Sequence, residues 1–112
     1  MDSQITEDAV VRALAALAQP ARLRAFRELV VAGPTGLNPG VLAERLEMPA
    51  TTLSFHLKEL VGAGLAQAER DGRFLIYRAG FGQMNALLGY LTAHCCEGAS
   101  CELADADSRC AC

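Results

Sequence analysis

Residues 38–64 constrain the fold most, because they hold two short helical patterns joined by a tight connection. Asn38-Pro39 pairs a capping residue with proline, which is typical of a helix start. Met48-Pro49-Ala50 leads into the second pattern, and Gly64 stands where a left-handed C-terminal cap is expected. The apolar residues recur at helical spacing and predict the inward faces of the two helices: Val41, Leu42 and Leu46, then Leu53, Leu57, Leu60 and Val61.

A hairpin pattern follows this helix pair directly. Residues 65–69 and 74–78 are strand-like runs, and Arg70-Asp71-Gly72-Arg73 separates them, with Asp-Gly placed for a two-residue turn. Two short helices followed at once by a hairpin form the winged helix-turn-helix arrangement, in which the second helix enters the major groove of DNA. The pattern therefore predicts a nucleic-acid-binding fold.

Three further helices complete the predicted order. Thr6 starts the first, which ends near Gln19, Pro20 starts the second, which stops at Gly33-Pro34, and the last runs from Phe81 to about His94. The second helix carries one apolar stripe, which predicts its inward face: Leu23, Phe26 and Val30. The fold class is α+β and mainly α, a winged helix-turn-helix of order α-α-α-α-β-β-α. We expect one domain over residues 1–97 and a cysteine-containing, acidic, partly disordered tail over 98–112.

Length and charge limit the functions to consider. The 112 residues are enough for one domain, and the short apolar runs exclude a membrane-spanning segment. The residues Met1–Glu7 do not resemble a targeting peptide, so we expect a cytoplasmic protein. A net charge of −3 counts against DNA binding. However, Cys95–Cys112 alone carries that −3, which leaves the preceding residues neutral.

Eight residues are candidate DNA contacts. With the leucines facing inward, the second helix of the pair turns polar and aromatic residues outward, where they suit base edges and phosphates. Two arginines at the hairpin tip suit the phosphate backbone or the minor groove. A polar helix face is also ordinary solvated surface, and the histidine could hydrogen-bond within the domain instead. The candidates are Thr51, Thr52, Ser54, Phe55, His56, Lys58, Arg70 and Arg73.

These motifs resemble the ArsR/SmtB family of metalloregulatory repressors over roughly residues 10–101. The resemblance rests on Leu17–Leu23, Thr52–Lys58, Arg70–Arg73 and Tyr77-Arg78. It implies a homodimer that binds double-stranded operator DNA and represses its own resistance operon. It also implies a dimer interface between the first and last helices, which suits their apolar stripes: Val10, Leu14 and Leu17, then Met84, Leu87, Leu88 and Leu91.

All five cysteines lie at the C-terminus, at positions 95, 96, 101, 110 and 112. Cytosolic thiols stay reduced, so such a cluster indicates a metal or redox site more than disulfides. Gly98 allows the chain to turn so that Cys95, Cys96 and Cys101 surround one soft, three-coordinate centre. Arsenic(III) fits this donor set, with antimony(III) as a second inducer and no organic cofactor. A subgroup of arsenic-responsive family members is similar in carrying a Cys-Cys pair plus a third cysteine after the last helix.

Several alternatives remain open. Zinc or cadmium would need a fourth ligand, which His94 or a tail cysteine could supply, and nearby thiols could instead sense oxidation. The cysteines Cys110 and Cys112 have no assigned role. An enzyme is disfavoured, because the chain lacks a Cys-x-x-Cys, an anion-binding loop and a βαβ pattern. A winged helix that binds only protein is the remaining class, and it would show no salt-dependent DNA affinity.

Overall fold

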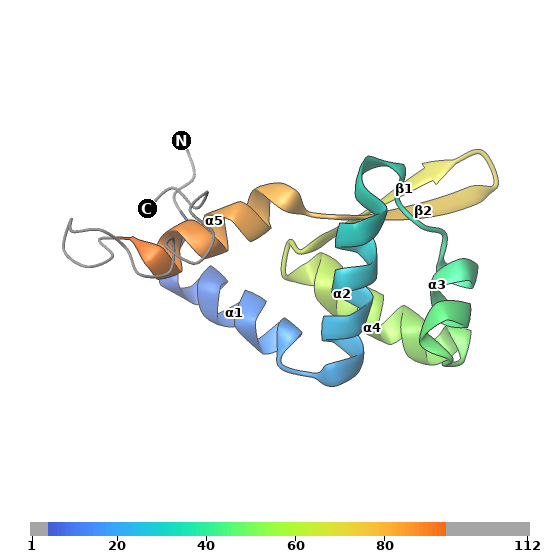
Figure 1. Ribbon diagram of the computed structural model, residues 1–112, viewed down its shortest axis with the longest axis horizontal. Helices are drawn as coiled ribbons and strands as arrows, with labels where there is room; N and C mark the ends of the chain where they lie inside the picture. The colour runs from blue at the N-terminus through green and yellow to red at the C-terminus, as the bar shows by residue number, and fades with distance from the viewer. Residues whose placement is uncertain (1–4, 94–112) are drawn as a thin grey trace.

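The computed structural model describes residues 5–93, which form five α-helices, a short 3-10 turn and one hairpin (Figure 1). The order of elements confirms the predicted fold class, a mainly helical winged helix-turn-helix. The elements are α1 Glu7–Leu17, α2 Pro20–Ala32, η1 Gly33–Thr35, α3 Pro39–Leu46, α4 Ala50–Gly62, β1 Ala66–Asp71, β2 Phe74–Ala79 and α5 Phe81–Thr92.

The helix starts follow the local signals in the sequence. The hydroxyl oxygen of Thr6 accepts a hydrogen bond from the amide of Ala9 at 3.1 Å, which caps α1. The side chains of Gln19 and Asn38 cap α2 and α3 in the same way, and each of these helices has proline in its first turn. The start of α4 differs, because Pro49 provides no side-chain cap.

The core lies where α1, α2 and α4 meet the base of the hairpin. On α2, Ala25 and Leu29 are fully buried, and Phe26 is buried beside them. Three positions predicted to face inward are wrong, since Leu23 is 44%, Val41 36% and Val61 40% exposed. Leu23 lies two residues before the buried Ala25, which is about 200° around the helix, so the burial of Ala25 leaves Leu23 facing solvent.

The hairpin pairs β1 with β2 in an antiparallel register that runs from Ala66 opposite Ala79 to Asp71 opposite Phe74. The two-residue loop is therefore Gly72-Arg73, one position later than the Asp71-Gly72 expected from the sequence. A turn on Asp71-Gly72 of the commonest type needs a positive φ at both residues. With Gly72 first in the loop, the positive φ of 63° falls on glycine.

The base of this hairpin, which we call the wing, is fixed to the domain by a third chain segment. The amide of Leu37 donates to the carbonyl of Tyr77 at 2.9 Å, and the amide of Tyr77 donates back at 2.8 Å. The guanidinium of Arg78 donates from Nε to the carbonyl of Pro34 at 2.7 Å and pairs with the carboxylate of Glu69. The wing thus has a fixed base and a projecting tip.

The helices α1 and α5 pack together at the end of the domain farthest from the wing tip (Figure 1). Large apolar side chains on both helices remain exposed: Val11 58%, Leu14 42%, Leu88 52%, Tyr90 44% and Leu91 53%. Other residues of the predicted stripes turn into the domain, since Val10 and Leu87 are buried. Within residues 5–93, no helix combines the length and apolar character needed to cross a bilayer.

Candidate nucleic-acid interface

The helix α4 carries most of the candidate DNA contacts on one outer face. Its leucines at 53, 57 and 60 are at most 1% exposed and attach the helix to the core. The tight connection before it includes Glu47, which takes the left-handed conformation at a φ of 54° and lets the chain reverse after α3. The side chains of Thr51, Thr52, Ser54, Phe55 and Lys58 are all exposed.

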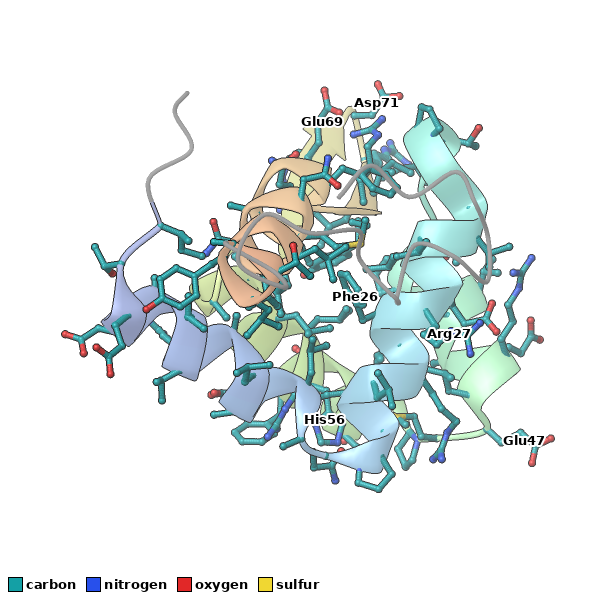
Figure 2. The ribbon with its side chains drawn as sticks, turned by 60° about the vertical axis from the view of Figure 1, so that its left-hand side comes forward. Phe26, Arg27, Glu47, His56, Glu69 and Asp71 are labelled. Atoms are coloured by element: carbon teal, nitrogen blue, oxygen red, sulfur yellow. The ribbon has the colours of Figure 1, made fainter. Side chains whose placement is uncertain are left out.

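His56 differs from the other candidates on α4, because its side chain is buried at 7% exposed. It lies beside the start of α2 (Figure 2), where its Nδ1 is 3.4 Å from Nη1 of Arg22. Burial, and then the charge of Arg22, lower the pKa of the imidazole from its ordinary value of 6.5. His56 therefore makes a contact within the domain, which was the alternative to a DNA contact in the sequence analysis.

The wing provides the second group of cations. Arg70 and Arg73 are exposed at the tip, where long side chains can reach a phosphate or the minor groove. Arg78 is held at the base by Glu69 and the carbonyl of Pro34, so it is committed to the fold. Residues 5–93 hold nine lysines and arginines and eight acidic residues, a net of +1. The cations that face outward on α4 and the wing tip can therefore act locally.

Comparison with known proteins supports this geometry. A family model described as a helix-turn-helix domain matches residues 17–66. An ArsR-like transcriptional regulator from Rhodococcus sp. RHA1 is 27% identical over 80% of this chain and 82% of its own, with a TM-score of 0.71. A possible transcriptional regulatory protein from Mycobacterium bovis is 30% identical over 77% of this chain and 91% of its own, with a TM-score of 0.60.

A solution structure of the same Mycobacterium bovis fragment is described as a homodimeric winged helix-turn-helix DNA-binding domain of a possible ArsR-family transcriptional regulator. It is 26% identical over 88% of this chain and 96% of its own, with a TM-score of 0.63. The chain belongs to the ArsR family. It is an ArsR-family winged-helix transcriptional regulator, and this family is not enzymatic.

One more solved structure is similar to the chain. A protein described as a possible transcriptional regulator for arsenical resistance is 31% identical over 70% of this chain and 82% of its own, with a TM-score of 0.56. No curated protein sequence matches the chain.

The predicted thiolate ligands Cys95, Cys96 and Cys101 lie outside the described residues of this ArsR regulator, as do Cys110 and Cys112. In the part of the chain that the structure describes, no three His, Cys, Asp or Glu side chains gather in a way that could hold a metal ion.

Sequence reasoning missed one residue of the interface region, Arg22. It was part of the motif Leu17–Leu23 that carried the family resemblance, but no role was assigned to it. The only available signal was an arginine in the first turn of a helix that starts with proline. Its partner is 34 positions away in the chain, and such a distant contact leaves no trace in local sequence patterns.

Proposed function

We propose that this ArsR-family regulator is an arsenic(III)-responsive repressor that acts in the cytoplasm. It binds operator DNA as a homodimer and dissociates when arsenic(III) binds the thiolates of Cys95, Cys96 and Cys101. Antimony(III) is a second inducer of the same soft character.

The observation that carries the proposal is the position of the soft donors relative to α5. This helix ends at Thr92, and Cys95 and Cys96 are the third and fourth residues after it. Arsenite is trivalent and thiophilic, and each thiol that binds replaces one arsenic-bound hydroxyl group, which leaves as water. Three sulfurs satisfy such a centre, and the described residues contain no cysteine that could compete. The 31% identity to a possible regulator of arsenical resistance supports the same ligand.

The apolar outer faces of α1 and α5 support the homodimer. Four aliphatic side chains on these two helices are each more than 40% exposed. Single exposed apolar residues are common on protein surfaces, whereas several on two packed helices indicate a surface that a partner covers. A second copy that covers Val11, Leu14, Leu88 and Leu91 would bury them in a symmetric interface. The pair would present two copies of α4 and two wings to an inverted repeat.

This arrangement links the proposed ligand to DNA. Thiolates gathered at the end of α5 act on the same helix that forms the subunit contact. A change there alters the relative placement of the two α4 helices, which must match two half-sites at once. A coupling free energy of about 1–3 kcal/mol lowers DNA affinity by roughly 5- to 150-fold, which is enough for derepression.

The test uses a fluorescent duplex that the full-length protein selects from a randomised library. We expect arsenite to release the protein from this duplex, with antimonite acting similarly. Cys96→Ser should bind the duplex as before and no longer respond, whereas the control Cys110→Ser/Cys112→Ser should respond normally. Release of the Cys96→Ser protein by arsenite overturns the assigned site. Release by zinc or cadmium alone, or only by an oxidant, overturns arsenic as the ligand.

A further inference from the structure

Arg22 joins three helices through one side chain. Its Nε donates a hydrogen bond to the carbonyl of Ala16 at 2.8 Å. That carbonyl belongs to the last turn of α1, where helix geometry leaves the oxygen without a partner in the helix. Its Nη1 reaches Nδ1 of His56 on α4. The backbone amide of Arg22 is itself held by the side chain of Gln19 at 3.0 Å, which fixes the start of α2.

The contact with His56 has only one chemically sensible direction. A guanidinium carries donors and no acceptor, so Nδ1 must accept the hydrogen bond and the neutral ring carries its proton on Nε2. His56 is the one polar side chain among residues 5–93 that is buried. Over the same residues, no buried side-chain nitrogen or oxygen lacks a hydrogen-bond partner. Since burying a polar ring without a partner is costly, Arg22 fixes where this ring can lie.

The imidazole in turn contacts an aromatic ring on the outer face of α4. The centroids of His56 and Phe55 lie 5.6 Å apart at an interplanar angle of 62°, an edge-to-face arrangement. Phe55 is 56% exposed, so its own packing holds it only in part. Contacts therefore run from the end of α1, through Arg22 and His56, to a side chain on the candidate DNA-binding face.

We propose that Arg22 is a positioning residue for DNA recognition. Acting through His56, it sets the rotation of α4 about its axis and the direction in which Phe55 points, and so determines sequence preference without touching DNA. His56 accordingly serves DNA reading from inside the domain and not through a base contact. The inference rests on α4 as the helix that reads DNA, and it does not depend on the arsenic response.

Two simpler roles predict different outcomes. If Arg22 only supplied positive charge near DNA, Arg22→Lys would restore full binding. If it only stabilised the fold, any substitution with the same loss of stability would have the same effect. A lysine has one donor group at the end of a flexible stem and cannot hold the Ala16 carbonyl and the His56 ring together. The results for Arg22→Lys and for a variant of equal stability therefore distinguish a positioning role from a charge effect and from a stability effect.

The experiment measures the affinity of full-length variants for the duplex that the wild type selects and for a scrambled duplex of equal length. We expect Arg22→Met and Arg22→Lys both to lower the ratio of the two affinities about tenfold, the size of one lost base contact. Leu29→Val, a core change on α2 away from this contact, lowers the melting temperature and leaves the ratio unchanged. His56→Asn, which keeps an acceptor near the position of Nδ1, should retain more of the ratio than His56→Leu.

The double variant Arg22→Met/His56→Leu completes the comparison. If Arg22 acts through His56, the double variant lowers the ratio no further than either single variant does. Additive losses, or full rescue by Arg22→Lys, overturn the inference. If the wild type selects no DNA sequence at all, the claim that α4 reads DNA is wrong. If the wild type selects a sequence and the variants show the same affinity ratio as the wild type, only the role of Arg22 is rejected.

Discussion

Replacing Gly36 by alanine should detach the base of the wing from the rest of the domain. Gly36 lies at a φ of 71° and immediately precedes Leu37, which forms the bridge to Tyr77. A Cβ at this position would lie 2.6 Å from Cγ2 of Ile76 and 2.7 Å from the carbonyl oxygen of Tyr77. The Ile76 side chain can rotate away, but the Tyr77 oxygen belongs to the backbone and accepts the hydrogen bond from Leu37.

A matched control lies three residues earlier in the chain. Gly33 has a φ of 67° and a ψ of −147°, Gly36 has 71° and −175°, and a Cβ on Gly33 would meet nothing within 4 Å. Both substitutions carry the backbone strain of about 1–3 kcal/mol expected for a non-glycine residue in this region. Only Gly36→Ala also breaks two bridge hydrogen bonds, at about 0.5–1.5 kcal/mol each. We therefore expect it to cost about 1–3 kcal/mol more than Gly33→Ala.

Urea unfolding of both variants gives this difference in the free energy of unfolding. Hydrogen exchange at the amides of Leu37 and Tyr77 shows whether the bridge has opened. Gly36→Ala should speed hydrogen exchange at both amides and weaken DNA binding. Gly33→Ala should leave the exchange rates and the DNA affinity close to those of the wild type. Equal destabilisation by the two substitutions, with the two amides still protected, would refute the argument that the bridge fixes the wing.

Three further outcomes follow from the described contacts. Because burial and then a neighbouring guanidinium lower the pKa of His56 below 6.5, the unfolded chain takes up the proton first. The free energy of unfolding therefore decreases as the pH falls below 6.5 toward the lowered pKa of the folded state. Urea titrations at about pH 7.5 and about pH 5.5 should show a smaller difference for His56→Asn than for the wild type. Arg73→Gln should reduce the salt dependence of DNA affinity by about one phosphate contact, whereas Arg78→Gln should mainly lower the melting temperature, and equal salt slopes for the two would contradict this. Leu57→Ala should cost about 2–5 kcal/mol of stability, while Leu88→Ala should raise the dimer dissociation constant in sedimentation equilibrium, and an unchanged constant would exclude this part of α5 from the interface.

Much of this fold was predictable because its signals are local. The cap and proline at Asn38-Pro39 start α3 as expected, since a side-chain oxygen bonds an amide only three residues away. Gly64 takes a φ of 80°, as a residue ending a helix in the left-handed conformation should. The polar face of α4 also followed from its leucine spacing alone.

The errors arise where tertiary contacts decide between local choices. Leu23 has the right spacing for the core, but α2 buries the face that holds Ala25 and Leu29, and Leu23 is exposed. The wing turn sits on Gly72-Arg73, because strand register decides which of two adjacent dipeptides forms the loop. The burial of His56 depends on Arg22, far away in the chain. Periodicity describes how residues on one helix relate to each other, and it contains nothing about the partner that a distant helix supplies.

The single bridge at Tyr77 has a mechanical consequence for the outer wing. Three residue pairs, from Glu69 with Ile76 to Asp71 with Phe74, extend beyond it as a ribbon of only two strands. Such a ribbon is about 10 Å long at the usual rise per residue and is barely stable when unsupported. The arginines at the wing tip are thus carried by a flexible two-stranded segment above a fixed base. A tip that can bend is able to follow DNA grooves of unequal width, and it loses conformational entropy when DNA binding holds it in one position.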